Sequence, residues 1–287
     1  MPKLEREIWS VLGLVFDATN QSAALTTVNR IIEQDERCFL TTPNLNFVIA
    51  AQSDRAFYQS VVDSDLSVAD GMPLIWVAKL LGIPLPERVA GSSLFDELSK
   101  QKANPEKIKV FFFGGQPGVA EQAHHKLNET SSAMISCGFY DPGFVSVDEM
   151  SSPDILKKVN DASPDFIVVA LGAKKGQAWI QKNKAYLNAS VISHLGAVIN
   201  FVAGNIERAP TFWQRCGLEW LWRIKQEPSL WRRYLFDGLA FLKLLILNVF
   251  PLAVYDRALK HSSCFKQAGE IQQEANLISL SGSIHHS

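Results

Sequence analysis

Ile108-Lys109-Val110-Phe111-Phe112-Phe113-Gly114-Gly115-Gln116-Pro117-Gly118 is the clearest fold signal in this chain. Its first six residues, mostly β-branched or aromatic, predict a buried strand, and the glycines that follow predict a turn into a helix over 118–129. A strand that turns through glycines into a helix is typical of a mononucleotide-binding half, where phosphate lies at the helix N-terminus. Gly114 and Gly115 are therefore candidate phosphate ligands, with the equally weighted alternative that they only make the turn.

Other apolar runs repeat this pattern along the chain. Short buried strands are predicted at 39–40, 47–50, 134–135, 166–171 and 191–193, and further helices at 153–160 and 177–187. Strands that alternate with helices predict an α/β fold with a Rossmann-like, mostly parallel sheet and helices on both faces. Because ligands of such sheets bind beyond the carboxyl ends of the strands, the loops at Gly172 and Gly196 are expected to line the same crevice as Gly114.

Length and composition are those of a globular protein. The chain has 287 residues, 47% apolar and 20% charged, which is enough for one large α/β core and an appendage. The four cysteines form neither a CxxC pair nor a Cys/His cluster, so we expect a reducing compartment, no disulfide framework and no zinc site. The N-terminus has mixed charge and no apolar core, which predicts a cytoplasmic-side protein without a signal peptide. With a net charge of −1, we expect no nucleic-acid partner.

The character of the chain changes after about Gly204. Between Arg208 and Lys243 lie seven basic and three acidic residues, together with four of the seven tryptophans. The stretch 234–255 is largely apolar but is interrupted by ionisable residues and a proline, whereas a membrane-spanning helix needs about 20 predominantly apolar residues. This pattern favours docking at the membrane interface, where tryptophan lies at headgroup level and arginine meets lipid phosphate.

An amphipathic helix that covers the core or a protein partner is the alternative for this region. We predict three parts: an α/β catalytic domain over 1–204, a helical membrane-associating appendage over 205–262 that covers the site, and a disordered tail over 263–287.

Three polar groups follow apolar segments in the first third of the chain. They are Thr42-Pro43-Asn44, Ala69-Asp70-Gly71 and Glu87-Arg88-Val89-Ala90-Gly91. Asp70 can accept a proton and Arg88 can hold an anion, which suggests group transfer from a phosphate-activated donor to a hydroxyl. Taken alone, an aspartate before a glycine is by default a helix cap or turn residue.

In kind and order these residues resemble the T-x-N, A-D-G and E-R-x-x-G motifs of the WecG/TagA/CpsF family of glycosyltransferases. This family makes lipid-linked intermediates of bacterial surface polysaccharides and includes lipid-linked N-acetylmannosaminyltransferases. Further matches follow in the same order: Gly114 to Ala120, Gly204 with Arg208-Ala209-Pro210, and Gly217-Leu218-Glu219-Trp220-Leu221-Trp222-Arg223 with Glu227-Pro228. The resemblance covers roughly residues 10–235.

The resemblance implies an inverting, metal-independent hexosyltransferase that needs no cofactor. It would move a sugar from a UDP-sugar to an acceptor sugar on polyprenyl diphosphate, in surface or exopolysaccharide biosynthesis. The enzyme would lie peripherally on the cytoplasmic face of the inner membrane, as a monomer or a homo-oligomer. The matching motifs imply that Asp70 is the general base, that Thr42 and Asn44 orient the donor at the reacting centre, and that Arg88 stabilises the diphosphate leaving group.

The carry-over to the C-terminal arginines is less direct. Arg223 matches the first of the family's arginines that are implicated in binding the acceptor diphosphate. After Glu227-Pro228 this chain is one residue shorter than the usual family pattern. Either one phosphate ligand is missing, or Arg232 and Arg233 supply it in a shifted register.

Two departures concern the donor. Where the family commonly reads G-x-P-x-Q-E before a Trp-Ile-like pair, this chain has Gly172-Ala173-Lys174-Lys175-Gly176-Gln177-Ala178-Trp179-Ile180, so Gly176 takes the place of Gln and Gln177 that of Glu. Asn200 also stands where the family usually has Asp. Gly114, Gly115, Gly172, Gln177, Gly196 and Asn200 remain the candidate donor-binding residues. The identity of the donor sugar is left open, as is a weakened or inactive enzyme.

Two other functions compete with this interpretation. A nucleotide-binding oxidoreductase is disfavoured, because no G-x-G-x-x-G fingerprint with a suitably placed acidic residue follows a predicted strand. A non-catalytic partner in a polysaccharide-assembly complex is motivated by the altered loop from Gly172 to Trp179. The presence of both Asp70 and Arg88 speaks against it.

Overall fold

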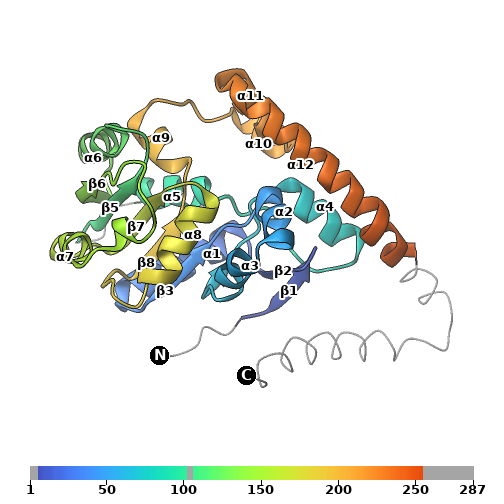
Figure 1. Cartoon of the computed structure of the whole chain (residues 1–287), viewed down its shortest axis with the longest axis horizontal. Coiled ribbons are helices and arrows are strands. Elements are labelled where there is room, and N and C mark those ends of the chain that lie inside the picture. The colour runs from blue at the N-terminus through green and yellow to red at the C-terminus, as the bar shows by residue number, and fades with distance from the viewer. Residues whose placement is uncertain (1–5, 102–105, 255–287) are drawn as a thin grey trace. The chain divides into compact units, whose positions relative to one another are not determined.

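The central feature of the protein is a six-stranded sheet in which every pairing is parallel (Figure 1). The computed structural model describes residues 6–101 and 106–254. The strands lie in the order β4-β3-β8-β7-β5-β6. Their bounds are β3 Cys38–Thr41, β4 Leu66–Ser67, β5 Ile108–Gly114, β6 Met134–Tyr140, β7 Phe166–Ala170 and β8 Val191–His194. A separate antiparallel hairpin joins β1 (Ile8–Val11) to β2 (Leu14–Asp17).

Helices connect the strands and continue beyond the last of them. The first group is α1 Gln21–Glu33, α2 Leu45–Ser53, α3 Arg55–Val62, α4 Met72–Leu80, α5 Gly91–Lys100, α6 Val119–Thr130, α7 Pro153–Asp161, α8 Ala173–Asn183 and α9 Val198–Ala203. The C-terminal group is α10 Thr211–Arg215, α11 Glu219–Gln226 and α12 Trp231–Leu244, which continues into the π-helix η3 Leu245–Val249. Two short 3₁₀ helices are η1 Glu149–Ser151, before α7, and η2 Pro228–Leu230, before α12.

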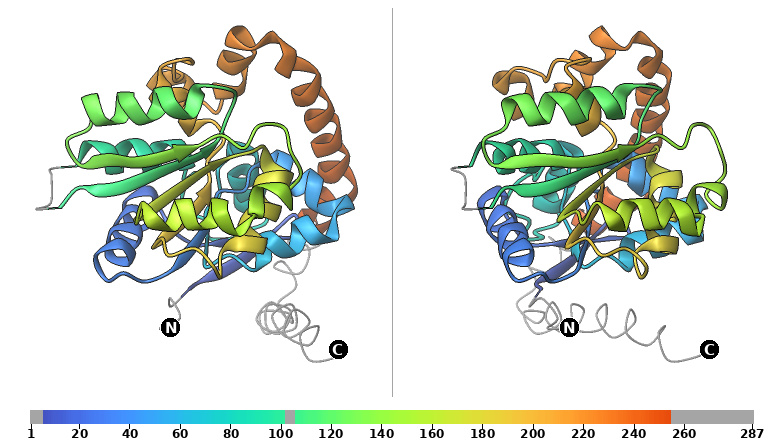
Figure 2. Two further views of the ribbon diagram at one scale, coloured as in Figure 1. Left: turned by 60° about the vertical axis from the view of Figure 1, so that its left-hand side comes forward. Right: turned by 90° about the vertical axis from the view of Figure 1, so that its left-hand side faces the viewer.

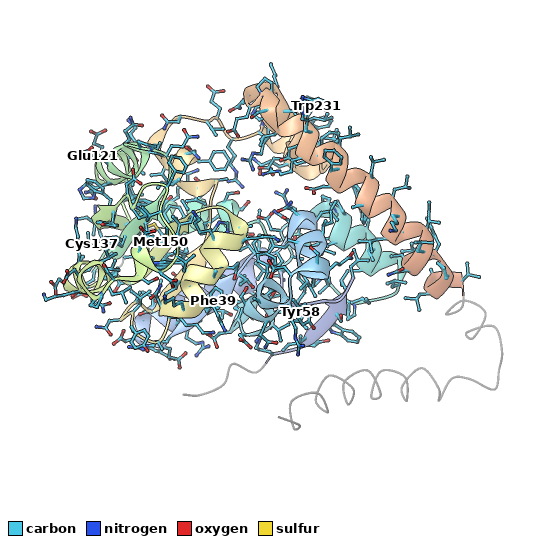
Figure 3. All side chains as sticks on the ribbon, in the orientation of Figure 1. Phe39, Tyr58, Glu121, Cys137, Met150 and Trp231 are labelled. Atoms are coloured by element: carbon cyan, nitrogen blue, oxygen red, sulfur yellow. The ribbon has the colours of Figure 1, made fainter. Side chains whose placement is uncertain are left out.

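The helices cover both faces of the sheet (Figure 2). Because successive side chains of a strand point to opposite faces, β5 contributes to two cores. Val110 and Phe112 belong to the core that α1, α5, α6 and α9 cover, whereas Phe111 and Phe113 belong to the core that α7 and α8 cover. Phe39 and Met150, labelled in Figure 3, are part of the second core. A parallel sheet that is buried on both faces explains why its strands are almost continuously apolar.

The predicted α/β fold with a Rossmann-like parallel sheet is confirmed, and the described part of the segment after 204, which ends at residue 254, is largely helical as predicted. The strand predicted at 47–50 is wrong, because these residues lie in α2. The side-chain oxygen of Asn44 accepts hydrogen bonds from the backbone N–H groups of Asn46 and Phe47, which is a helix N-cap. An N-cap signal directly before a short apolar run therefore outweighed the strand-like composition of that run.

The chain divides into two compact units at the boundary between Phe241 and Leu242. The proposed division at residue 204 stays a prediction, and the tail predicted to be disordered over 263–287 lies outside the described residues. The site described next belongs to the first unit.

Candidate functional site

A cavity of about 690 Å³ opens beyond the carboxyl ends of four neighbouring strands, β4, β3, β8 and β7. Thr42 and Asn44 reach it after β3, Asp70 after β4, Gly172 after β7, and Gly196 after β8. The opposite wall comes from α11 and α12. Residues from four strand ends thus converge on one space, as expected at the carboxyl edge of an open parallel sheet.

Asp70 is held in this cavity by the backbone. Its N–H donates to the carbonyl of Pro43 at 3.0 Å, and its Oδ2 accepts the N–H of Gly91 at 3.3 Å. Burial raises the pKa of the carboxyl to about 6, while Arg88 and the Gly91 N–H lower the pKa and the Glu219 carboxylate raises it. A carboxylate with this pKa is deprotonated at neutral pH yet more basic than an exposed aspartate, which suits a general base.

Gly91 lets the backbone approach two neighbouring side chains closely. A Cβ at this position would lie 2.5 Å from Leu195 Cδ2 and 3.0 Å from Thr42 Cγ2. A side chain at this position, the first of α5, would therefore force Leu195 and Thr42 to shift.

Arg88 forms an ion pair with Glu219 in which Nη1 lies 3.0 Å from Oε2. The two side chains are 14% and 19% exposed, so the pair is largely shielded from water. Glu219 is the first residue of α11, so the pair joins the loop before α5 to the C-terminal helices. The pair also sets the direction in which the Arg88 guanidinium faces.

Thr42 and Asn44 contribute a hydroxyl and an amide. Thr42 is 7% exposed, and Asn44 uses its carbonyl oxygen in the N-cap of α2. The NH₂ group of Asn44 is therefore the part of this amide that remains for a ligand in the cavity.

The C-terminal arginines separate into two kinds. Arg223 and Arg233 line the cavity, and the Arg223 guanidinium lies 3.5 Å from the Glu227 carboxylate. Arg232 is exposed, does not line the cavity, and lies over the ring of Trp231 at 5.5 Å. Of the two arginines considered for a shifted register, only Arg233 lines the cavity, and its role in binding the acceptor diphosphate stays a prediction.

Gly114 and Gly115 do not line the cavity. Both have positive φ angles, +91° and +104°, and the N–H of Gly115 donates to the carbonyl of Ala170 at 2.8 Å. A Cβ at Gly114 would lie 2.6 Å from Leu171 Cδ2. The strand-to-helix turn and its close packing against the end of β7 account for these glycines without a ligand.

Gln177 and Asn200 also lie outside the cavity lining. Gln177 is fully buried on α8, and neither atom of its side-chain amide has a hydrogen-bond partner among the described residues. Asn200 is partly buried on the short helix α9. Their roles in donor binding stay predictions.

The structure thus brings eight of the candidate residues together and leaves five apart. The eight that line the cavity are Thr42, Asn44, Asp70, Arg88, Gly172, Gly196, Arg223 and Arg233, and the five that do not are Gly114, Gly115, Gln177, Asn200 and Arg232.

The sequence analysis missed His194, which lines the cavity at the end of β8. Its ring occupies the space that a side chain at Gly176 would fill, so the altered Gly176 position is filled from a neighbouring strand. Burial lowers the pKa of His194 to about 4, which keeps the imidazole neutral at neutral pH. No pattern in the sequence connects these two positions.

The sequence analysis also missed Glu219 and Asp237. Glu219 could have been found, because it stands inside one of the motifs that carry the family resemblance. Asp237 accepts from the side-chain amide of Asn46 at 3.4 Å, which ties α12 to α2. The four-residue spacing of Arg233, Asp237 and Phe241 places them on one side of α12, and all three line the cavity.

The cavity combines acidic, basic and neutral polar groups. Three arginines line it together with four carboxylates, and burial raises the pKa of two of these, Asp70 and Asp237. Such a set can hold a phosphate-linked substrate and accept a proton. Within residues 6–101 and 106–254, no cluster of three or more histidine, cysteine, aspartate or glutamate side chains has the arrangement of a metal site. Metal independence itself stays a prediction.

Comparison with known proteins agrees with this geometry. Residues 9–253 match the glycosyl transferase WecG/TagA/CpsF family. An N-acetylglucosaminyldiphosphoundecaprenol N-acetyl-β-D-mannosaminyltransferase of Bacillus spizizenii is 29% identical over 204 residues, which are 71% of this chain and 77% of that protein. A Staphylococcus aureus protein of the same name is 24% identical over 225 residues, covering 78% and 85% of the two chains. The chain therefore belongs to the glycosyl transferase WecG/TagA/CpsF family and is a glycosyltransferase.

Proposed function

We propose that the protein is an inverting glycosyltransferase that moves a sugar from a UDP-sugar to an acceptor sugar on polyprenyl diphosphate. The observation that carries this proposal is Asp70, a carboxylate of raised pKa in a cavity that three arginines also line. Two diphosphates, one on each substrate, need cations, and the cavity supplies them on two sides. The names of the relatives support an N-acetylhexosamine on each substrate and a role in cell-envelope polysaccharide synthesis.

In the reaction, Asp70 takes the proton of the acceptor hydroxyl while its oxygen attacks the anomeric carbon of the donor. The bond from that carbon to the diphosphate breaks, and its electron pair leaves with UDP. Attack from the face opposite the leaving group inverts the anomeric centre. General-base help of this kind contributes about 10²–10⁴-fold to the rate.

Arg88 is placed to stabilise the negative charge that develops on the departing diphosphate. Its planar guanidinium can bind two phosphate oxygens at once. Because Glu219 already pairs with Arg88, the guanidinium is oriented before the donor binds. Such preorganisation reduces the reorganisation needed in the transition state.

We further propose that the enzyme lies on the cytoplasmic face of the membrane. The helical segment from Pro228 to Val254 is 27 residues long, and an 18-residue stretch within it has a mean hydropathy of 1.8, which meets the length and composition of a span. The charges on the cavity side of α12 favour a position at the interface instead. Trp231, Leu235 and Phe236 are 49%, 50% and 68% exposed, as expected of side chains that enter lipid.

Vesicle sedimentation followed by alkaline carbonate extraction tests the membrane proposal. An interfacial helix is expected to bind vesicles and to be released by carbonate. Retention after extraction would indicate a spanning helix, and failure to sediment with vesicles would refute membrane docking.

A turnover assay tests the enzymatic proposal. The full chain is incubated with UDP-N-acetylmannosamine and N-acetylglucosaminyl diphosphoundecaprenol in detergent, and UDP release is measured, followed by a panel of other UDP-sugars. Release is expected only when donor and acceptor are both present. Absence of acceptor-dependent release with every donor would refute the proposal.

A further inference from the structure

A second hollow of about 380 Å³ lies between α11 and α12 and adjoins the catalytic cavity. Its walls are Ile224, Trp231, Leu235 and Leu239, with Trp220, Tyr234 and Gly238, which also line the catalytic cavity. We call it the apolar groove. Trp231, labelled in Figure 3, stands at the first position of α12. None of the seven lining side chains carries a charge, in contrast to the catalytic cavity next to it.

Gly238 marks the junction of the two hollows. A glycine inside a helix costs about 1 kcal/mol relative to alanine, so a compensating reason is expected. Backbone conformation does not supply one, because Gly238 lies within α12 and its φ is not positive. Packing does not supply one either, because no atom lies within 4 Å of an added Cβ. The open space above Gly238 is therefore room for something that the chain itself does not provide.

The charges around the junction indicate what kind of molecule fits. Arg233 lines the catalytic cavity, and its guanidinium lies 5.1 Å from the centre of the Tyr234 ring, which also lines the groove. A cation thus stands where the polar cavity ends and the apolar groove begins. A ligand that matches both sides has an anionic group at the cation and a hydrocarbon chain beyond it.

We propose that the apolar groove binds the first isoprene units of the acceptor, with the chain crossing Gly238 as it leaves the diphosphate. This inference rests on the proposed function, since it assigns the acceptor's hydrocarbon to a place beside the catalytic cavity. Branched hydrocarbon against Trp220, Trp231 and Leu239 gains the free energy of apolar burial. The groove thereby lets the enzyme distinguish a lipid-linked sugar diphosphate from a soluble sugar nucleotide that carries the same anionic group.

Two short acceptors of identical head group test the groove. Both are N-acetylglucosaminyl diphosphates, one esterified with geranyl, which has two isoprene units, and the other with methyl. Binding to the full chain is followed by tryptophan emission at one fixed detergent concentration, because Trp220 and Trp231 line the groove. The geranyl compound is expected to change the emission and to bind about ten-fold more tightly than the methyl compound.

Leu239→Asn is the decisive variant, because this side chain lines the apolar groove and not the catalytic cavity, and it is 56% exposed, so the fold does not depend on it. It is expected to reduce the geranyl advantage and to leave binding of the methyl compound unchanged. Leu242→Asn is the matched control, since it makes the same substitution on the same helix at a 51% exposed position that lines neither hollow. This control is expected to bind both compounds as the unaltered protein does.

Equal binding of the two compounds by the unaltered protein would overturn the proposal. So would a loss in Leu239→Asn that is the same for both compounds. A Leu239→Asn effect confined to vesicle binding or to oligomeric state would also overturn it, because it would assign the groove to bulk lipid or to a second copy. UDP release is measured separately with the same acceptors. Absence of turnover alongside a geranyl-specific emission change would count against the proposed reaction and not against the groove.

Discussion

Two pairs of glycines at the carboxyl end of the same parallel sheet differ in what they offer a ligand. After β5, Gly114 and Gly115 turn into α6 with positive φ angles and pack against the end of β7. After β7 and β8, Gly172 and Gly196 border the cavity. The first pair serves the turn from strand to helix, and the second pair leaves space. A glycine loop at a strand end therefore marks a binding site only where the neighbouring strands also leave the space empty.

The largest expected effect tests whether the reaction takes place in the cavity that Gly172 and Gly196 border. Asp70→Asn keeps the shape of the side chain and removes its basicity, so kcat is expected to fall by about 10²–10⁴-fold. UDP binding, measured by calorimetry, is expected to remain. Asp154→Asn, an exposed carboxylate in the first turn of α7, serves as the control and should leave kcat unchanged. Equal turnover of Asp70→Asn and the unaltered enzyme would remove Asp70 from the mechanism.

One alanine substitution from each pair of glycines compares the two pairs directly. Gly114→Ala meets both a positive φ and Leu171, so it is expected to lower the free energy of unfolding by about 1–3 kcal/mol while the KM for the donor stays constant. Gly196→Ala places its methyl 3.4 Å from His194 Nε2, an ordinary contact, and should leave stability nearly unchanged while the KM for the donor rises. Denaturant unfolding and initial rates measure the two quantities. The comparison breaks down if Gly114→Ala raises the KM at unchanged stability.

The same contrast applies to two adjacent arginines. Arg233 lines the cavity and Arg232 lies over Trp231 outside it. Arg233→Gln is expected to raise the KM for the acceptor about five-fold, because a partly solvated ion pair contributes about 1 kcal/mol. Arg232→Gln should leave this KM within experimental error. The reverse order would show that the register of these arginines was assigned wrongly.

The smallest effect is a change in pH dependence. Because Asp70 must be deprotonated to act and its pKa is raised to about 6, kcat/KM is expected to rise with pH through about 6. Glu219→Gln removes a nearby negative charge, which lowers the Asp70 pKa and moves this acidic limb to lower pH. Glu227→Gln, which removes the carboxylate beside Arg223, should not move the limb. If the acidic limb lies at the same pH in the unaltered enzyme and in both variants, the titration of Asp70 does not cause it.

The sequence predicts most of the sheet because its strands are buried on both faces. The continuous apolar run before Gly114 needs no long-range information to be recognised as a strand. The segment after Asn44 is different, since its short apolar run fits a strand or a helix equally well and the cap decides between them. The wrong strand at 47–50 was predicted because the apolar run was given more weight than the helix N-cap that precedes it.

The site was predictable where its residues stand in motifs and not where it depends on contacts across the fold. Asp70 and Arg88 stand in the motifs of the first third of the chain. Arg88 and Glu219 are 131 positions apart in the sequence, and the contact of His194 with Gly176 joins a strand to a helix. Contacts of this kind produce no periodic pattern in the sequence, so they could not be predicted from it. Gln177 is the opposite case, because a motif position suggested a ligand and the structure has a fully buried side chain outside the cavity lining, so its role in donor binding stays a prediction.

The burial of Asp70 links the pH dependence of folding stability to the pH dependence of catalysis. Folding raises the pKa of this carboxyl from 3.8 to about 6, so the folded state holds the proton more tightly than the unfolded chain does. The stability that this proton provides is fully present below about pH 3.8 and is lost as pH rises through about 6, the same interval in which the base becomes active. For this one group, the protonated form that stabilises the folded state is also the form that cannot act as a base.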